Sequence, residues 1–540
     1  MSETPPARVG PSGMAPRGEK SPPTLGRQIA LNAVLNLAGR FVSIAGWMLV
    51  TPRMLGNLGT ERFGLWSLLT VLAGASTAFD FGLSGSLTKF VAEFRATGDR
   101  VGLRAVYTQG AVFYVGLGLL FFAAIALARA PLLALFKIPP ALRGEAGAAL
   151  LAAAAVYALL NGFTFLSSVL AGLHRLDLWN RILIVTTLIQ LAGVVLVLRF
   201  GGGVTALFLN TGIGLLVGIA AARVAIQRIE PGLRFTRERG PQGLLRRMVH
   251  YSVALQIINL GVLAQFQLDK VLFGSMLGLA AVGSYELGYR LVSALWSVPS
   301  LLLPPLLPAV AHLEALGERE RVVRLYRRAS RYVLAVAFAI AAGVIALAPP
   351  LYQAWLGSGH RDAALAAIAL AAMLAVNILT GVGSTIVRGA GRPGLEARYQ
   401  LLAMALHLAL SLILIRRWGY IGGLWALTLS TSLASLWFVG AFHRYVREPI
   451  APFLARVVMP PLAAALLAGA AAWWAAGAGS AAVEAWTRPQ ALLRLALGGC
   501  AFVVVAVAGL VATRALLPVD VRDLLGLLRR GTPAAEDRAA

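Results

Sequence analysis

The chain has 540 residues, of which 58% are hydrophobic and only 13% are charged. Soluble domains carry about 25% charged residues, so this composition, with a mean hydropathy of +0.76, indicates a polytopic membrane protein. The formal net charge of +25 lies in short segments between apolar runs, without interleaved aromatic residues. That pattern excludes a nucleic-acid partner and favours loops facing anionic lipid. The single cysteine, Cys500, excludes disulfide frameworks and thiolate metal sites.

Residues 1–27 are rich in Pro, Gly and Ser and predict a disordered basic tail. A bilayer-spanning helix needs about 20 mostly apolar residues, and fourteen such runs follow the tail. They cover roughly 28–52, 62–83, 105–129, 146–170, 180–199, 203–224, 250–277, 281–311, 331–356, 363–387, 396–415, 421–443, 452–478 and 490–514. Four prolines between Pro299 and Pro308 are expected to kink or break the eighth run.

The distribution of basic residues predicts the orientation of the chain. An even number of spans places both termini on one side of the membrane. If that side is the cytoplasm, the inner segments hold about three times as many Lys and Arg residues as the outer loops. The positive-inside rule therefore favours cytoplasmic termini.

A short motif predicts an internal repeat. Met54-Leu55-Gly56 followed by Phe63 returns as Met276-Leu277-Gly278 followed by Tyr285, with the same offset for every member. Both copies join the outer end of one span to the next span, so spans 1–6 and 7–12 are expected to form two related bundles. The expected parts after the tail are 28–228, a basic cytoplasmic linker 229–249, 250–447, an extra pair of spans in 448–515, and a cytoplasmic tail 516–540.

Three polar residues interrupt the first apolar run. Asn32, Asn36 and Arg40 recur at four-residue steps and share one helix face. A charge at the centre of a span costs about 2.5 to 3.5 kcal/mol, so it normally faces a bundle interior or a water-filled cavity. These three residues are therefore candidates for substrate binding. The alternative is that Arg40 pairs with Asp80 or Asp269 to hold the bundles together.

A second polar set lies in spans 7 and 8. Asp269 and Lys270 are adjacent in span 7, and Glu286 and Arg290 are four residues apart in span 8. The structural interpretation is an ion pair across neighbouring helices. The functional interpretation assigns Lys270 and Arg290 to substrate binding, and Asp269 and Glu286 to ion coupling, because intramembrane carboxylates often serve in ion relays. Asp80, near the inner end of span 2, is a third coupling candidate or an interfacial residue.

Two further polar residues, Asn377 and His407, are each isolated within a span and are expected to hydrogen-bond between helices. Enzyme signatures are missing: the sequence has no His-Glu-x-x-His, no phosphate-binding loop and no nucleophile elbow. No predicted outer loop exceeds about twenty residues. We therefore expect movement of a substrate, with no catalytic residue, metal or cofactor.

Most of residues 28–445 resembles a known family, the bacterial oligosaccharide flippases of the polysaccharide-export type. The motifs that carry the resemblance are Thr51-Pro52, Leu55-Gly56, Leu58-Gly59, Glu61, Phe63-Gly64, Trp66, Asp80, Gly82, Asp269-Lys270, Gly274, Gly278, Val282-Gly283, Tyr285, Tyr289 and Gly389-Ala390-Gly391-Arg392-Pro393. The family belongs to the multidrug/oligosaccharidyl-lipid/polysaccharide exporter superfamily.

The resemblance implies an all-α fold, in which two six-helix bundles form a V around a central cavity and two C-terminal helices follow. It also implies alternating access, by which an oligosaccharide on a polyprenyl diphosphate turns from the inner to the outer leaflet of the bacterial plasma membrane for lipopolysaccharide or other surface polysaccharide assembly. Implied partners are the lipid-linked oligosaccharide, membrane lipids, H+ or Na+ for antiport, and a polysaccharide polymerase or other assembly proteins.

The charges within the spans are consistent with such a substrate. A diphosphate cannot cross about 30 Å of hydrocarbon without a polar path, and Arg40, Lys270 and Arg290 are expected to replace its hydration with charge-assisted hydrogen bonds. Two alternatives remain open. One is a cation-coupled multidrug exporter, and the other is a membrane glycosyltransferase or polysaccharide ligase, which the short outer loops disfavour.

Overall fold

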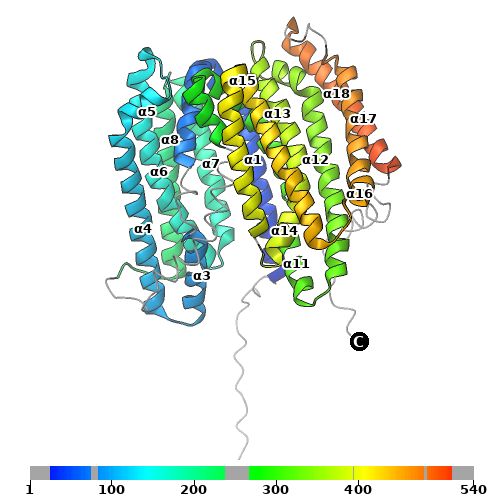
Figure 1. Ribbon diagram of the computed structural model, residues 1–540. Coiled ribbons are helices and arrows are strands. Elements are labelled where there is room, and N and C mark those ends of the chain that lie inside the picture. The colour runs from blue at the N-terminus through cyan, green and yellow to red at the C-terminus, as the bar shows by residue number, and fades with distance from the viewer. Residues whose placement is uncertain are drawn as a thin grey trace, which may run out of the picture.

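The structure is a computed structural model that describes residues 25–74, 83–236, 267–392, 394–479, 483 and 485–513, without the side chains of 25–41 and 72–74. Within these residues all regular structure is helical, which confirms the predicted fold class (Figure 1). The labelled helices are α1 (Leu25–Gly74), α3 (Leu83–Ala96), α4 (Arg100–Leu127), α5 (Arg129–Leu135), α6 (Arg143–Gly172), α7 (Leu176–Arg199), α8 (Val204–Ile229), α10 (Leu279–Ser300), α11 (Leu306–Ala315), α12 (Arg319–Trp355), α13 (Arg361–Asn377), α14 (Gly381–Gly389), α15 (Gly394–Val446), α16 (Ile450–Phe453), α17 (Met459–Ala476) and α18 (Arg488–Ala512). A further helical segment covers 267–276.

The helices have the length and the surface of membrane spans. In the described part of the chain, nine helices are long and apolar enough to cross a bilayer. Large apolar side chains point outward, including Leu127 (87% exposed), Phe200 (83%) and Trp474 (81%). Apolar surface on this scale is stable against lipid and unstable against water, so the chain is a multi-pass membrane protein. The total of fourteen spans stays a prediction.

Two of the long helices are hairpins that turn at a glycine. In α1, the ring centroids of Trp47 and Trp66 lie 5.9 Å apart, whereas a straight helix would separate them by roughly 28 Å. The chain reverses at Gly59, whose φ of 75° and ψ of 169° favour glycine. In α15, a reversal at Gly419 (φ 57°, ψ −132°) brings His407 within 3.2 Å of Ser430.

The two halves of the chain meet at a pair of glycines. A Cβ on Gly64 would lie 1.9 Å from the carbonyl oxygen of Leu279, and a Cβ on Gly283 would lie 2.6 Å from that of Thr60. The backbone nitrogen of each glycine is also close to the other's Cβ position, at 3.0 and 3.3 Å. The contacts are reciprocal, as a two-fold axis between related elements requires. Glycine is needed at both positions because backbone meets backbone there.

This reciprocity corrects the register of the internal repeat. Gly64 pairs with Gly283, and by the same offset the turn at Gly59 corresponds to the turn at Gly278, which has φ 99° and ψ −177°. The motif had matched Gly56 to Gly278, so the predicted register is wrong by three positions. A shift of three positions is close to one helical turn and keeps nearly the same face, so the apolar motif matched in the wrong register.

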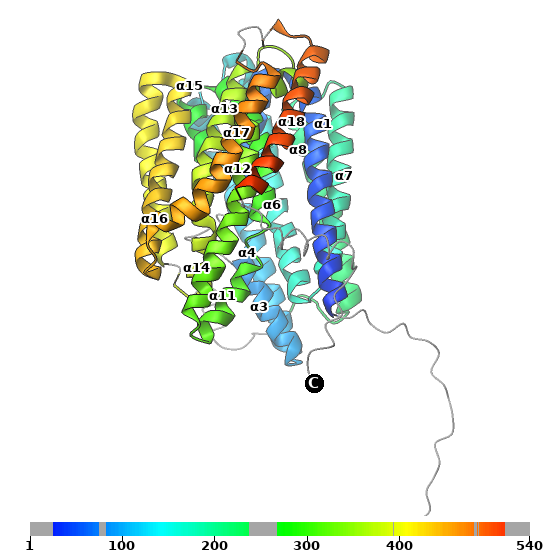
Figure 2. The same cartoon turned by 90° about the vertical axis from the view of Figure 1, so that its right-hand side faces the viewer.

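The helices form two groups that meet at α1 and α10. In Figure 1, the blue and cyan helices α3 to α8 lie on one side and the green and yellow helices α11 to α15 on the other. We call residues 25–236 the first half and 267–446 the second half. α1 packs on α6, α7, α8 and α10, whereas α17 and α18 pack on α12 at the outer edge (Figure 2). The prolines break the eighth run as predicted, because α10 ends at Ser300 and α11 begins at Leu306.

Candidate functional site

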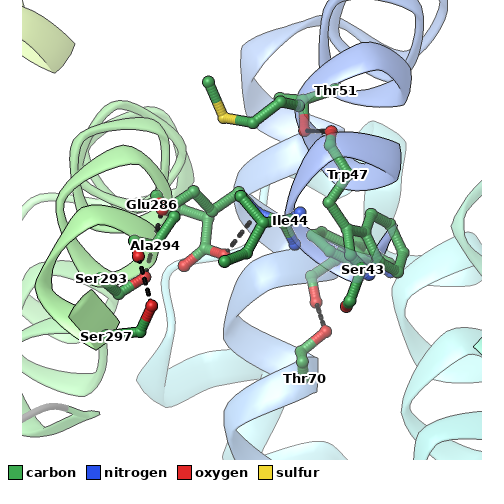
Figure 3. Close-up of a pocket in the computed structure, with 12 residues that line it drawn as sticks. Ser43, Ile44, Trp47, Thr51, Thr70, Glu286, Ser293, Ala294 and Ser297 are labelled. Atoms are coloured by element: carbon green, nitrogen blue, oxygen red, sulfur yellow. Dashed lines mark hydrogen bonds and ion pairs between the residues drawn. The ribbon is translucent and has the colours of Figure 1, made fainter. Parts of the chain in front are cut away.

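A cavity of about 500 Å³ lies where α1 of the first half meets α10 of the second half. This volume is within the range of about 300 to 1,000 Å³ that is typical of small-molecule sites. Figure 3 shows that its wall combines residues of both helices. The aromatic, hydroxyl and charged residues of the wall are Ser43, Trp47, Thr51, Trp66 and Thr70 from α1, and Glu286, Arg290, Ser293 and Ser297 from α10.

Among the described residues of this wall, Arg290 is the cation. Its Nε donates to Glu286 Oε1 at 2.8 Å, one helical turn earlier on α10. The guanidinium carbon lies 4.5 Å from the ring centroid of Trp66 and 4.9 Å from that of Trp47. These are cation–π distances, so a charge from the second half lies against two aromatic faces of the first half.

Glu286 joins Arg290 to a second cation. Lys270 Nζ lies 2.7 Å from Glu286 Oε2, and both side chains are less than one-tenth exposed. Lys270 also lies 4.6 Å from the ring centroid of Tyr289. The cluster therefore contains an ion pair across neighbouring helices, which is the structural interpretation of the sequence. Lys270 faces Glu286 and Tyr289 and is not among the described residues that line the cavity.

The opposite charges explain how the cluster can be buried between helices of a membrane protein. An unpaired cation there is costly, whereas Glu286 compensates Lys270 and Arg290 at salt-bridge distance. Removing one partner of a buried pair typically costs about 3 to 5 kcal/mol, because the other charge stays buried without compensation. Glu286 is therefore the residue on which both cations depend.

Asp269 lies beside this cluster with different partners. Tyr285 donates a hydrogen bond to Asp269 Oδ2 at 2.8 Å, and His407 Nε2 lies 3.0 Å from Asp269 Oδ1. The other ring nitrogen of His407 lies 3.2 Å from Ser430 Oγ, whose hydroxyl donates to the Leu427 carbonyl. One ring nitrogen of His407 thus faces a carboxylate and the other a hydroxyl, so this buried contact links the 267–276 helix to the α15 hairpin.

The predicted interhelical roles of two polar residues are confirmed. His407 bonds to Ser430 across the α15 hairpin and contacts Asp269 on the 267–276 helix. Asn377 of α13 lies 2.5 Å from the hydroxyl of Tyr399 on α15.

Four predicted site residues lie outside the described side chains. The backbone of α1 covers Asn32, Asn36 and Arg40, but their side chains are not described, and Asp80 falls in the undescribed segment 75–82. The structure therefore brings together Asp269, Lys270, Glu286 and Arg290 only, and the roles of all eight residues stay predictions.

The sequence reasoning missed Trp47 and Trp66. Trp47 follows Arg40 by seven residues and therefore lies on the same helix face as the polar residues of the first span, which is the signal that could have identified it. Trp66 belongs to the motif that carries the family resemblance, but nothing in the sequence placed its ring against that of Trp47. Only the reversal at Gly59 brings the two rings together.

Solved structures of two kinds of membrane transporter share this fold. The lipid II flippase MurJ in an inward closed conformation has a TM-score of 0.63 at 12% identity, covering 92% of this chain and 100% of its own. An inward-facing multidrug resistance MATE family transporter of the MOP superfamily has a TM-score of 0.62 at 13% identity, covering 77% and 98%. An outward-facing transporter of that family has 0.51 at 15% identity, covering 77% and 95%. The chain therefore has the fold of MOP superfamily transporters.

Sequence comparison defines the family within that class. Residues 25–314 match the family described as polysaccharide biosynthesis protein, and this region includes the α1 hairpin, α10 and the cavity between them. The chain belongs to this family. No curated protein matches the sequence closely enough to add to this assignment.

Proposed function

We propose that the protein is a flippase that moves a polyprenyl-diphosphate-linked oligosaccharide from the inner to the outer leaflet of the bacterial plasma membrane, for surface polysaccharide assembly. The observation that carries the proposal is a cavity between two repeats in a member of the polysaccharide biosynthesis family. Transporters built from repeats commonly bind substrate at the repeat interface near the membrane midplane. The polyprenyl tail stays in lipid while the polar head crosses through the protein.

Transport proceeds in this proposal by alternating access. The contact between Gly64 and Gly283 holds the halves together near the turns of both hairpins. This contact between the halves has to open before the cavity becomes accessible from the side of the membrane on which the turns lie. With both termini in the cytoplasm, as the basic residues favour, the turns lie on the outer side.

The diphosphate is proposed to follow a cationic path along α1. Position 40 lies seven residues, or two helical turns, before Trp47, and positions seven apart share a helix face. Arg40 is proposed to bind the diphosphate or an acidic sugar, with Asn32 and Asn36 beside it. Lys270 and Arg290 add positive potential to the same path.

Export after replacement of Arg40 tests this path. Arg40→Ala is expected to abolish surface polysaccharide at normal expression, whereas Arg40→Lys keeps the charge and is expected to retain part of the export. Arg53→Ala is the matched control, because Arg53 is an exposed residue of the same helix. Full export by Arg40→Ala would contradict the proposal.

We further propose that Asp269 couples transport to H+ or Na+, with Glu286 and Asp80 as the other candidate carboxylates. The buried contact of Asp269 with His407, a side chain that can exchange a proton near neutral pH, supports H+. Asp269→Asn is expected to lose ion-driven transport in vesicles while still binding lipid-linked oligosaccharide extracted from cells. Asp362→Asn, at an exposed position of α13, serves as control. Unchanged ion dependence in Asp269→Asn would remove Asp269 from the coupling.

The shared fold with a multidrug resistance transporter favours one rival function, a cation-coupled drug exporter. Deletion of the gene separates the two. A flippase deletion is expected to accumulate lipid-linked sugar on the inner leaflet, whereas a drug-exporter deletion sensitises cells to cationic drugs without that accumulation.

A polysaccharide polymerase is a proposed partner, and the proposed bundle boundaries are 28–228 and 250–447.

A further inference from the structure

Four of the five hydroxyl groups in the described cavity wall, all except that of Ser43, donate their hydrogens to carbonyls of their own helices. Thr51 and Thr70 donate to the carbonyls of Trp47 and Trp66, at 2.6 and 2.7 Å. The serines of α10 do the same: Ser293 donates to the Arg290 carbonyl at 3.2 Å and Ser297 to the Ala294 carbonyl at 2.6 Å. A hydroxyl oxygen that donates its hydrogen still has two lone pairs. The wall therefore presents acceptor oxygens from both helices.

The donors of the cavity are concentrated on Arg290. A guanidinium carries five N–H groups, and the Nε–H of Arg290 goes to Glu286. Its two amino groups leave four further N–H donors at the cavity, beside the faces of Trp47 and Trp66. The site thus combines hydrogen-bond acceptors, one forked donor and aromatic faces.

A diphosphate is a poor match for this wall. Its oxygens are acceptors, which meet the acceptor oxygens of the threonines and serines and the carboxylate of Glu286. Glu286 offsets one of the two positive charges of Arg290 and Lys270, and its carboxylate would repel a second anion bound against it.

A sugar ring matches the same wall. Its hydroxyls donate to the acceptor oxygens and accept from the guanidinium, and its C–H face packs against aromatic rings, whose faces carry partial negative charge. We propose that the cavity between α1 and α10 is a carbohydrate subsite, in which a pyranose ring packs on Trp47 and Trp66. Hydroxyl groups of the sugar donate hydrogen bonds to the side-chain oxygens of Thr70 and Ser297. The inference rests on the proposed function and separates the sugar from the diphosphate, which binds elsewhere on the path.

Saturation-transfer NMR on the full chain in lipid nanodiscs, free of glycoside detergent, tests this subsite. The probes are the methyl glycosides of glucose, N-acetylglucosamine and glucuronic acid, with inorganic pyrophosphate as competitor. Ring C–H protons of at least one glycoside are expected to receive saturation. Excess pyrophosphate is expected to leave that signal in place.

Two variants with matched controls locate the binding. Trp47→Ala is expected to weaken glycoside binding about tenfold through the loss of stacking, whereas Trp474→Ala removes an exposed tryptophan of α17 and is expected to change nothing. Thr70→Val removes one acceptor oxygen at an exposed position without changing the fold. It is expected to weaken binding several-fold, unlike Thr187→Val, which removes a similar hydroxyl on α7 away from the cavity.

The inference is overturned if no glycoside binds, if Thr70→Val and Trp47→Ala both bind like their controls, or if pyrophosphate displaces the sugar. The proposed transport function is tested separately by the deletion strain. Glycoside binding at the predicted residues without accumulation of lipid-linked sugar would leave the subsite standing and reject the flippase. Accumulation of lipid-linked sugar without glycoside binding at these residues would support the flippase and reject the subsite.

Discussion

Gly64→Ala tests how closely the two halves have to approach beside the cavity. The added Cβ would lie 1.9 Å from the carbonyl oxygen of Leu279 and 2.8 Å from its carbonyl carbon, whereas ordinary contact begins at 3.4 Å. The obstacle is backbone, so no side chain can rotate out of the way. The helices would have to separate by about 1.5 Å to accept the methyl group.

Overpacking of this kind costs about 1 to 3 kcal/mol, and only in the conformation where the halves touch. A conformation with separated halves escapes the cost, so its population should rise about 5- to 150-fold relative to the touching one. The assay is labelling of Ser293→Cys in the cavity by a membrane-impermeant thiol reagent added outside intact cells. The background is Cys500→Ser, because Cys500 is the single native cysteine.

Gly64→Ala should accelerate this labelling, and Gly56→Ala should not. Gly56 lies on the same helix, and a Cβ there would meet no atom within 4 Å. Gly283→Ala should act like Gly64→Ala, and the double variant should add less than the sum of the two, because both relieve one shared contact. Equal labelling rates for Gly64→Ala and Gly56→Ala would refute the reasoning.

Two further predictions concern stability and are read from thermal unfolding of the purified protein. Glu286→Gln should destabilise the fold by about 3 to 5 kcal/mol, since Lys270 and Arg290 lose their shared carboxylate; Glu320→Gln, from an exposed pair with Arg324, should have almost no effect, and equal losses would contradict the buried ion cluster. Gly419→Ala should cost about 1 to 3 kcal/mol through backbone strain, whereas Gly440→Ala, in open space within a helix, should be neutral or stabilising. Similar melting of these two glycine variants would argue against the reversal at Gly419.

The difference between the two repeats concentrates the charge in one half. In the register set by Gly64 and Gly283, Lys270 and Glu286 correspond to Thr51 and Ser67, and Tyr285 corresponds to Trp66. The first half thus supplies hydroxyl and aromatic groups where the second half supplies ions. Arg290 joins the two sets, because it is held by Glu286 and packs on tryptophans of the first half.

Most of the charge cluster could be anticipated from the sequence. The four-residue step between Glu286 and Arg290 predicted a shared face, and α10 brings the two side chains to 2.8 Å. The partner of Asp269 could not be anticipated, because His407 is distant in the sequence and reaches it through the packing of α15. The register of the repeat was also predicted wrongly, because apolar helical sequence matches almost as well when it is shifted by about one turn.

The sequence alone determined that this is an all-helical membrane protein with charges buried in its spans, because hydrophobic run length and the cost of a buried charge are local properties of the chain. The tertiary structure decided which of Lys270 and Arg290 lines the cavity. Two cations share one carboxylate, and the packing of α1 on α10 leaves Arg290 against Trp47 and Trp66. Lys270 contacts Glu286 and Tyr289 and does not line the cavity. That choice depends on how the two halves meet at Gly64 and Gly283, where direct backbone contact fixes the spacing that the pattern of residues does not contain.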